Sequence, residues 1–249
     1  MRTITAKMKP VGEKPRLLTP AEMMATAPLT ATTDLRTVVR HKFWQVGLVL
    51  RGAAKRALDL LVAGAAVLAL SPLLALTALA IRLESPGPVL FFQTRVGLRG
   101  RHFAMIKFRS MRIGAEAEKA ALAADNESGD GVIFKMRRDP RITRVGAFIR
   151  RFSIDELPQI LNVLRGDMTI VGPRPPVPSE VAQYTNSERK RLQGKPGLTC
   201  LWQIGGRSDL AFQQQVELDL EYLATQDLSQ DIKIIAKTLP AVLSGRGAY

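Results

Sequence analysis

The stretch that decides the fold is LLVAGAAVLALSPLLALTALAI, residues 60–81. Its 22 residues include no charged side chain. As a straight α-helix they would be roughly 33 Å long, which is enough to cross the hydrocarbon core of a bilayer. Ser71 and Pro72 stand in the middle of the run. The proline removes one helical hydrogen bond and clashes with the preceding turn, while the serine hydroxyl can satisfy the carbonyl left free. We therefore expect a break there.

The charges that flank this run do not choose a direction of crossing. Basic residues within about 20 positions of a membrane segment favour the cytoplasmic side. Those upstream are Arg40, Lys42, Arg51, Lys55 and Arg56, and those downstream are Arg82, Arg95, Arg99 and Arg101. Flanks so nearly equal favour a re-entrant helix-break-helix that dips into one leaflet and leaves both ends in the cytoplasm. A proline-kinked transmembrane helix is the main alternative, and a buried helix of a soluble protein is the lesser one.

The net charge of +14 is concentrated around the apolar run. Residues 1–56 and 82–112 carry net charges of +8 and +6, whereas residues 113–249 hold 18 basic and 17 acidic side chains. This distribution suits an anionic lipid surface or another polyanion. The length of 249 residues, 46% of them hydrophobic, allows one domain with a buried core. The single cysteine, Cys200, excludes an internal disulfide.

The chain is expected to be α+β and mainly helical, in three parts. Residues 1–45 hold four prolines and no apolar periodicity, which predicts a disordered basic tail. Residues 46–84 would form an interfacial segment and the re-entrant membrane helix. Residues 85–249 would form a small cytosolic, membrane-associated domain. In this domain VLFFQ and HFAMIKFRSM (residues 89–93 and 102–111) predict a short β-hairpin.

Four helices are expected in the third part. GAEAEKAALAAD (114–125) and QQQVELDLEYLA (213–224) are good helix formers. SIDELPQILNVL (153–164) predicts a helix with Ser153 as its N-cap and two acids in its first turn, a place that also suits a phosphate. DIKIIAKTLPAVL (231–243) predicts an amphipathic, interfacial helix with Ile232, Ile235, Leu239 and Val242 on one stripe.

An adjacent acidic pair, Asp155 and Glu156, follows two arginines in RRFSIDELPQILNVLRGDMTIVGPRP, residues 150–175. On its own such a pair is most simply a cluster of surface salt bridges. A second interpretation is catalytic. A carboxylate that attacks a diphosphate needs a metal ion or nearby guanidinium groups to cancel the charge on the phosphoryl oxygens.

Four ordered motifs give this pair a context. They are KFRSM (107–111), the segment DPRITRVGAFIRRFSIDELPQILNVLRGDMTIVGPRP (139–175), KPGLTCLWQIGGR (195–207) and the terminal GRGAY. Together with the apolar run they resemble the bacterial sugar transferases, the monotopic polyprenyl-phosphate phosphoglycosyl transferases that begin exopolysaccharide synthesis. The resemblance covers about residues 50–249.

The resemblance implies an enzyme of the bacterial inner membrane whose catalytic domain, residues 85–249, lies on the cytoplasmic face. It would transfer a sugar 1-phosphate from a UDP-sugar to undecaprenyl phosphate, through a covalent aspartyl-phosphosugar and with Mg²⁺. The terminal GRGAY favours glucose or galactose. An N-acetylated or deoxyamino sugar is the alternative within this class. Self-association into a homo-oligomer stays open.

Matched position by position, the resemblance makes Asp155 the nucleophile and Glu156 the metal ligand. The positions that it implies for polyprenyl phosphate are Arg150, Lys107, Ser71 and Pro72, and those for the nucleotide sugar are Arg174, Pro173, Gln203 and Arg207. The chain departs from the family pattern at Cys200, where glycine is usual, and at Gly205, where Ser or Asn is frequent. These departures weaken any inference about contacts to the sugar.

A different class of function also fits the charge distribution, namely a non-catalytic basic protein that binds anionic lipid or nucleic acid at a membrane. The nearly neutral residues 113–249 show no basic strand studded with aromatic side chains, as single-strand binders have. We therefore expect no nucleic-acid partner. Dependence of activity on Mg²⁺ and a UDP-sugar would separate the two classes.

Overall fold

The computed structural model describes residues 35–118, 121–122, 126–127, 132–133, 136, 138–206 and 210–244, with no side chain described for 35–46 and 48. The chain forms two compact units, Met1–Leu48 and Val49–Tyr249. The tail was predicted at residues 1–45, and residues 1–34 of it lie outside the described residues. Helix α2 (Leu35–Glu84) begins inside the range predicted for that tail.

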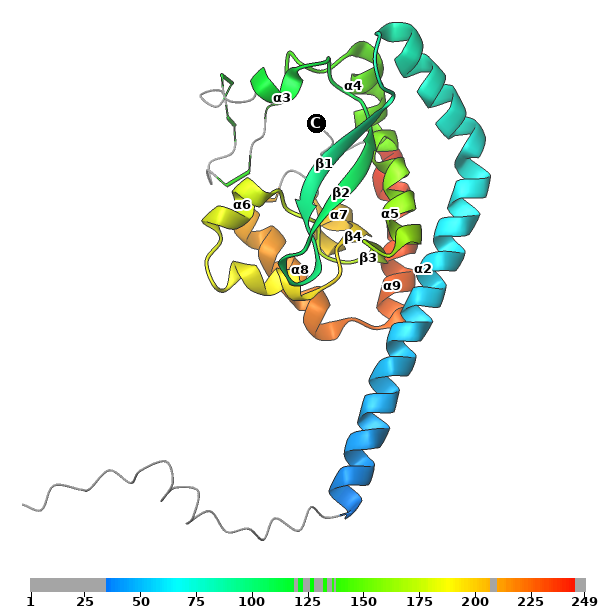
Figure 1. Ribbon diagram of the computed structural model, residues 1–249, viewed down its shortest axis with the longest axis vertical. Helices are drawn as coiled ribbons and strands as arrows, with labels where there is room; N and C mark the ends of the chain where they lie inside the picture. Colours follow the sequence, from blue (N-terminus) through cyan, green and yellow to red (C-terminus); the bar gives the residue numbers. More distant parts are fainter. Residues whose placement is uncertain are drawn as a thin grey trace, which may run out of the picture. The chain divides into compact units, whose positions relative to one another are not determined.

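The described part of the second unit is mainly helical with two small sheets (Figure 1), which confirms the predicted class. After α2 the elements are β1 (Leu90–Val96), η1 (Leu98–Gly100), β2 (His102–Phe108), α3 (Ala115–Glu118), α4 (Arg144–Arg151), η3 (Ile154–Gln159), α5 (Ile160–Arg165), β3 (Thr169–Val171), α6 (Pro178–Gln183), η4 (Glu188–Gln193), β4 (Gly197–Thr199), α7 (Leu201–Gly205), α8 (Phe212–Thr225) and α9 (Leu228–Ser244).

Helix α2 continues through Ser71 and Pro72 without interruption. Because Pro72 has no N–H, the carbonyl of Leu68 loses its helical partner, and the Ser71 hydroxyl donates to that oxygen at 2.9 Å. The upper part of the helix curves toward the start of β1 (Figure 1). The expected break is therefore a bend within one helix, and the re-entrant path through a membrane stays a prediction.

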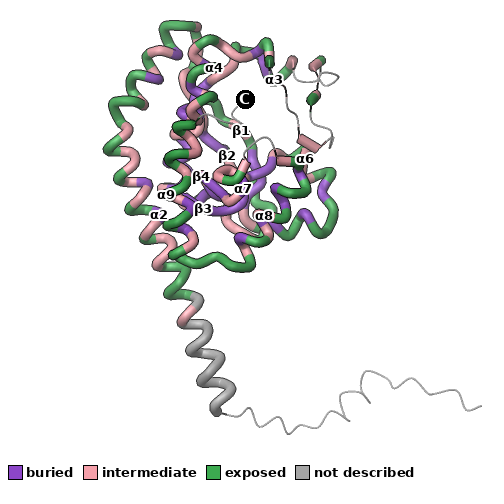
Figure 2. Tube along the Cα trace, turned by 180° about the vertical axis from the view of Figure 1, so that it is seen from behind, coloured by how far each residue is buried: buried purple, intermediate pink, exposed green. Residues whose placement is uncertain are grey.

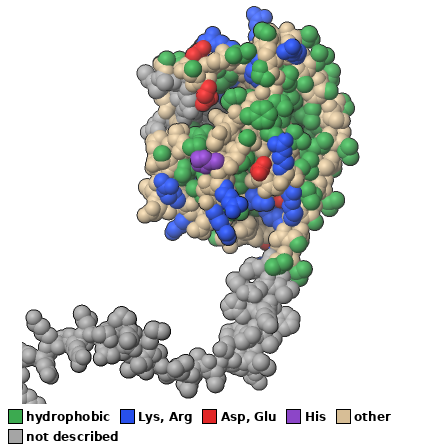
Figure 3. All heavy atoms as spheres, viewed as in Figure 1, with side chains coloured by type: hydrophobic (Ala, Val, Ile, Leu, Met, Phe, Trp, Pro, Cys, Tyr) green, Lys and Arg blue, Asp and Glu red, His purple; other side chains and the backbone are tan. Residues whose placement is uncertain are grey.

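Residues Val49–Glu84 of α2 are long and apolar enough to cross a membrane, with a mean hydropathy of 2.2 in their most apolar window. Only 11% of that window is buried, and Figure 2 shows exposed residues along most of this part of the helix. Hydrophobic side chains cover much of the right-hand side of the surface in Figure 3, where Figure 1 shows α2. An apolar surface of this extent is typical of a membrane contact.

Polar side chains just before the apolar run fasten α2 to the rest of the unit. Lys55 Nζ forms an ion pair of 2.6 Å with Asp231 of α9. The Arg56 guanidinium donates to the carbonyls of Val163 and Leu164, at 2.6 and 2.9 Å. These carbonyls lie at the C-terminal end of α5, where helical partners run out and a cation is favourable.

Asp59 makes the third attachment, to strand β3. It is 3% exposed, and its carboxylate accepts from the Thr169 hydroxyl at 2.7 Å and from the Ile170 N–H at 2.9 Å. Buried polar groups of a strand edge need partners. The membrane helix supplies one here, so it becomes part of the framework that holds β3.

The predicted hairpin is confirmed, because β1 and β2 pair antiparallel with Gln93 opposite Met105. Asn162, which is completely buried, joins this hairpin to helix α5. Its Oδ1 accepts from Ile106 N at 3.0 Å and its Nδ2 donates to Ala104 O at 2.8 Å. A single carboxamide thus satisfies two backbone groups at the edge of β2 and brings η3 and α5 against this strand.

Strands β3 and β4 form the second sheet and are parallel. Two glycines allow their close approach. A Cβ on Gly172 would lie 2.4 Å from Lys195 O, and one on Gly197 would lie 2.1 Å from Gly172 N. Either contact is far too short for a side chain, so these positions require glycine. The segment that follows β3 is thereby held against β4.

Helix α8 agrees with its prediction, whereas α9 divides its apolar residues between two sides. Ile234 is 2% exposed and packs in the core, while Ile232 and Leu239 are 56% and 66% exposed. Ile235 and Val242, predicted on the interfacial stripe, are half-buried. Packing of Ile234 therefore sets the rotation of α9 and leaves a narrower apolar stripe. Of the helix predicted at 114–125, the structure describes residues 114–118 and 121–122, and among these Ala115–Glu118 form the helix α3.

Candidate active site

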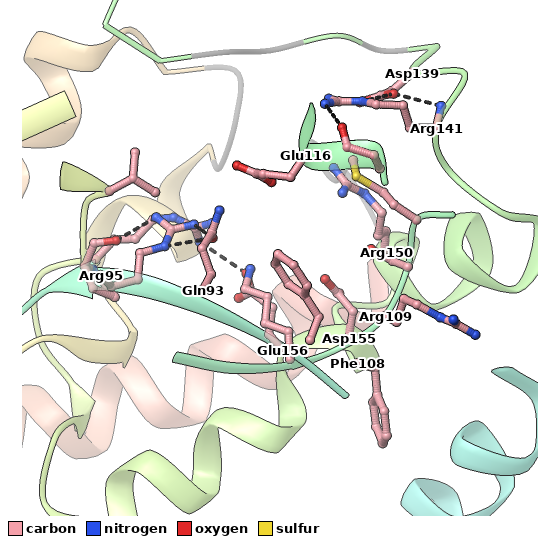
Figure 4. A pocket seen from close by; sticks show the side chains of 18 of the residues that line it. Gln93, Arg95, Phe108, Arg109, Glu116, Asp139, Arg141, Arg150, Asp155 and Glu156 are labelled. Atoms are coloured by element: carbon pink, nitrogen blue, oxygen red, sulfur yellow. Dashed lines mark hydrogen bonds and ion pairs between the residues drawn. The ribbon is translucent and has the colours of Figure 1, made fainter. Parts of the chain in front are cut away.

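A cleft of about 560 Å³ opens beside the hairpin, η3 and the segment after β3. Figure 4 shows side chains from these separate segments directed around it. Among the described residues the charged side chains that line it are Arg95, Lys107, Arg109, Arg112, Arg141, Arg150, Arg174, Arg191, Glu116, Asp139, Asp155, Glu156 and Glu180. Cations outnumber carboxylates, which favours an anionic ligand.

The acidic pair enters the cleft from η3. Ser153, with φ of 54°, is in the left-handed region and turns the chain from α4 into η3. Ser153 stands at the predicted N-cap position, but its side chain does not cap the helix. The first turn is 3₁₀ and not α, because Pro158 has no N–H to donate to the Ile154 carbonyl.

The two carboxylates have opposite environments. Burial alone would raise the pKa of Glu156, but the charges of Lys107 and Arg174 outweigh it and hold this pKa well below its ordinary value. Lys107 Nζ lies 2.7 Å from Glu156 Oε1, and Arg174 Nη1 lies 3.4 Å from the same oxygen. Burial raises the pKa of Asp155, and the nearby cations Lys107 and Arg150 offset it only in part. Glu156 is therefore a fixed anion, and Asp155 is a less stabilised one.

Asp155 is 8% exposed and lines the cleft. Its carboxylate accepts no hydrogen bond from any residue that the structure describes. Arg150, at the end of α4, also lines the cleft and acts on Asp155 through its charge. A buried carboxylate without hydrogen bonds, next to a cation that can hold an anionic substrate, has the properties of a nucleophile.

The loop after β3 places Arg174 opposite this pair. The Pro173 carbonyl accepts from Gly197 N at 2.9 Å, and Gly172 N donates to Thr199 O at 3.0 Å. These bonds fix the loop against β4. The Arg174 guanidinium then lies 5.8 Å from the centre of the Trp202 ring, within range of a cation–π contact.

The structure gathers most of the predicted site residues at one place. Those that line the cleft are Asp155, Glu156, Arg150, Lys107, Arg174 and Gln203. Pro173 is buried behind the cleft and shapes the loop. Ser71 and Pro72 lie on α2 and are not among the residues that line the cleft. Arg207 lies outside the described residues.

The resemblance implies that Lys107 binds polyprenyl phosphate, and in the structure Lys107 contacts the acidic pair. It pairs with Glu156, with 14% of its side chain exposed. Burial lowers the pKa of Lys107, although the neighbouring Glu156 acts in the opposite sense. It therefore stabilises the acidic pair in this structure, and contact with a lipid phosphate stays a prediction.

Sequence reasoning missed several polar residues of the cleft wall. Arg109 donates to the carbonyls of Ser85 and Pro86, at 2.9 and 2.7 Å, and so joins the wall to the end of α2. Gln93 and Arg95 lie on β1. The available signal was their position inside an otherwise apolar strand, VLFFQTRV, since a polar side chain in a strand that packs on a core needs a partner.

The donor atoms present fit a magnesium ion that arrives with a phosphate ligand. Mg²⁺ is bound through one or two carboxylates together with substrate phosphates. Lys107 and Arg174 occupy only Oε1 of Glu156, and the other oxygen has no hydrogen bond within the described part of the chain. No group of three or more potential metal-ligating side chains occurs there either, so a cage made of protein ligands alone is not supported.

Comparison with known proteins places these features in a family. The sequence profile described as "Bacterial sugar transferase" matches residues 50–245. The chain is 50% identical over 163 residues to the galactosyl transferase CpsE of Streptococcus agalactiae, which covers 65% of this chain and 36% of that protein. The chain thus spans about a third of that relative's length.

Two further relatives match over most of their own length. The exopolysaccharide production protein ExoY of Sinorhizobium fredii is 40% identical over 203 residues, covering 80% of this chain and 89% of that protein. The UDP-glucose:undecaprenyl-phosphate glucose-1-phosphate transferase of Caulobacter vibrioides is 42% identical over 203 residues, covering 78% and 72%. The residues matched by the family profile, 50–245, include every described residue that lines the cleft.

Proposed function

The chain belongs to the bacterial sugar transferase family, and we propose that it transfers a sugar 1-phosphate from a UDP-sugar to undecaprenyl phosphate. The product would be the first lipid-linked intermediate of an exopolysaccharide. The name of the relative from Caulobacter supports the lipid acceptor, and that of the relative from Sinorhizobium supports the pathway. The proposal includes glucose or galactose as the sugar, in agreement with the names of relatives that carry one or the other.

The observation that carries this proposal is the asymmetric acidic pair. Glu156 is held as an anion by Lys107 and Arg174. Asp155 beside it is buried, free of hydrogen bonds from described residues, and close to Arg150. A purely structural salt-bridge cluster would satisfy both carboxylates, whereas here only one of them is satisfied.

In the first step, a carboxylate oxygen of Asp155 attacks the phosphorus next to the sugar in the UDP-sugar. A new P–O bond forms to Asp155, the P–O bond to the departing nucleotide breaks, and UMP leaves with the electron pair. Arg150 and Arg174, which both line the cleft, would hold the phosphoryl oxygens while charge builds on them. The enzyme then carries an acyl phosphate that bears the sugar.

In the second step, a phosphate oxygen of undecaprenyl phosphate attacks the same phosphorus. The bond to Asp155 breaks, its carboxylate is restored, and the lipid diphosphate sugar is released. Splitting the reaction allows a soluble donor and a lipid acceptor to use one cleft in turn. We propose that Glu156, with the phosphates of the donor, binds Mg²⁺, which would neutralise part of the diphosphate charge.

The proposal also includes the membrane. Helix α2 has an exposed apolar surface, and α9 adds exposed Ile232 and Leu239. These surfaces support attachment to a bilayer, and we propose the cytoplasmic face of the inner membrane because UDP-sugars are made in the cytoplasm. The cleft would then lie within reach of a lipid phosphate.

Transfer of labelled sugar from UDP-glucose or UDP-galactose to undecaprenyl phosphate in nanodiscs tests the proposal directly. The wild-type chain should form a protein-bound sugar phosphate that hydroxylamine releases, as expected for an acyl phosphate. Asp155→Asn should lower transfer by more than about a thousandfold, because an amide oxygen is a poor nucleophile. Glu217→Gln, which alters an exposed carboxylate outside the cleft, is the matched control. Normal transfer by Asp155→Asn would refute the assigned nucleophile.

A further inference from the structure

Strand β1 brings two polar side chains to the cleft that the proposed mechanism does not use, Gln93 and Arg95. Arg95 is 9% exposed, and burial lowers the pKa of its guanidinium to about 10. Gln93 is half-buried. Burying a polar or charged side chain costs free energy of desolvation unless its polar atoms form hydrogen bonds.

Arg95 fixes the orientation of the Gln93 carboxamide. Its Nε and Nη2 lie 3.0 and 2.7 Å from Gln93 Oε1. A guanidinium can only donate hydrogen bonds, so the atom that faces it must be the amide oxygen. The amide nitrogen of Gln93 therefore remains as a donor, and it meets no acceptor among the described residues. Because Gln93 lines the cleft, this donor is available to a ligand.

The same arginine holds the loop that carries Arg174. Arg95 Nη1 donates to Pro175 O at 2.9 Å, and Val96 N donates to Pro176 O at 2.9 Å. The loop has two successive prolines, which provide only carbonyl groups for hydrogen bonding. Strand β1 supplies donors to both. Arg95 is thus a positioning residue that sets Gln93 and Arg174 on one wall at a fixed separation.

A second carboxamide, that of Gln203, also lines the cleft. Its Oε1 lies 3.4 Å from the thiol of Cys200. Because a thiol can both donate and accept hydrogen bonds, this contact does not set the amide orientation as the Arg95 guanidinium does for Gln93. Gln93 therefore offers a neutral donor whose orientation is fixed by its partner.

The Gln93 donor lies apart from Arg150 but on the same wall as Arg174, the second cation that would hold phosphate. In Figure 4, Gln93 and Arg95 lie on one side of Glu156, whereas Arg150 lies on the opposite side, beyond Asp155. Phosphoryl oxygens are best held by cations, and hydroxyl or amide oxygens are read with most discrimination by neutral donors with fixed geometry.

We propose that the Gln93 amide donates a hydrogen bond to an oxygen of the sugar in the bound UDP-sugar, which makes Gln93 a specificity-determining residue. This inference rests on the proposed function, since it requires a sugar nucleotide in the cleft. Arg95 acts through Gln93 and does not touch the sugar. A sugar whose hydroxyl or acyl oxygen does not reach the Gln93 amide is bound less well.

The test is Gln93→Glu, which keeps an oxygen for the bonds from Arg95 but replaces the donor nitrogen by an acceptor. Binding of UDP-glucose, UDP-galactose and UDP-N-acetylglucosamine is measured in the Asp155→Asn background, where no turnover occurs, and UDP is the ligand without a sugar. We expect the Kd of the preferred UDP-sugar to rise about tenfold relative to the Kd of UDP. When Gln93→Glu is made in the active enzyme, in which Asp155 is intact, the ratio of kcat/KM among the three donors should differ from that of the wild type.

Thr94→Val is the matched control, because Thr94 is the next residue of the strand and is exposed. Thr94→Val should leave unchanged both the Kd of the preferred UDP-sugar relative to that of UDP and the ratio of kcat/KM among the three donors. If Gln93→Glu weakens UDP and the UDP-sugars equally, the contact is to the nucleotide or the diphosphate and the sugar assignment is overturned. If it weakens neither, Gln93 has no role in recognition. If the wild-type chain transfers sugar from none of the three donors, the proposed function itself is refuted.

Discussion

The attachment of α2 to strand β3 through Asp59 should control both stability and activity, and Asp59→Ala tests it. The substitution removes the acceptor of two buried donors, the Thr169 hydroxyl and the Ile170 N–H. Both residues are nearly inaccessible, at 1% and 5% exposure. Strand β3 leads directly into the loop that carries Arg174. Loss of this attachment should therefore loosen the wall of the cleft as well as the contact with the membrane helix.

The expected magnitude follows from the number of bonds lost. A hydrogen bond to a charged group contributes about 1.5–3 kcal/mol, and a buried donor left unpaired costs about 1–3 kcal/mol. For two donors we expect a total of roughly 3–5 kcal/mol, because some relaxation is available to the hydroxyl. Asp59→Asn keeps a carbonyl oxygen and should cost only about 1–2 kcal/mol. Thr169→Val removes one donor together with its need for an acceptor and should cost about 1 kcal/mol.

The single cysteine provides the assay. Cys200 is 1% exposed and directly follows β4, which pairs with β3. Its thiol should react with a soluble alkylating reagent only when this region opens, so the labelling rate reports the free energy of opening when reclosing is fast. Asp59→Ala should raise the labelling rate about a hundredfold or more, and Thr169→Val should raise it less than about tenfold. The labelling rate of the variant that combines Asp59→Ala with Thr169→Val should exceed that of Asp59→Ala by only a small factor, because the two residues share one hydrogen bond.

The rate of sugar transfer should fall in the variants whose Cys200 labelling rate rises, and by the most in Asp59→Ala. Asp59 does not touch the cleft, so the loss of activity should be largely recovered in Asp59→Asn, which restores an acceptor. A labelling rate for Asp59→Ala within about threefold of the wild-type rate, with normal transfer, would refute the role given to this attachment.

Three further predictions concern the acidic pair and the membrane helix. Glu156→Gln should lower transfer strongly and shift the Mg²⁺ titration to higher concentration; an unchanged titration would rule out the ligand role. Because burial raises the pKa of Asp155, the ionised nucleophile should be lost on acidification above the ordinary aspartate range, so the rate of covalent labelling should already decline well above about pH 4; a rate constant that is flat down to that pH would contradict this. Cysteines placed near Arg51 and Arg99 in a cysteine-free background should react from the same side of sealed vesicles, and reaction from opposite sides would establish a spanning helix.

The hairpin and helix α8 could be predicted from the sequence because their patterns are local. Alternation of apolar residues marked the strands, and good helix formers marked α8. The resemblance to a family, and not periodicity, led to the residues of the cleft. Asp155 and Glu156 meet Lys107 and Arg174 only through the fold, since these four residues come from three separate segments. Pro158 was visible in the sequence, and its missing N–H could have predicted the 3₁₀ turn.

The support of the cleft could not be predicted in the same way. Arg95 is an arginine in a basic region of the sequence, and it was counted with the charges that flank the membrane run. Its bonds to Gln93 and Pro175 depend on how a strand and a distant loop meet. Lys55 was counted with the same charges, although it forms a bond with Asp231, far away in the sequence. Counts of basic residues do not distinguish cations that face solvent from cations that hold the fold together.

This distinction bears on how α2 meets the bilayer. At one end of the apolar run, Lys55 is paired with Asp231 of α9. At the other end, Glu84 accepts from the backbone N–H of Val145 in α4 at 3.0 Å, and Arg109 of the cleft wall donates to the carbonyls that follow α2. Both ends are therefore bound to one folded unit. A helix that crossed a bilayer would place its two ends about 30 Å apart on opposite faces, and this unit would have to extend through the membrane to hold both. Attachment of both ends to the same unit thus argues against a simple crossing of the bilayer, on grounds that are independent of the charges in the flanks, and the re-entrant path stays a prediction.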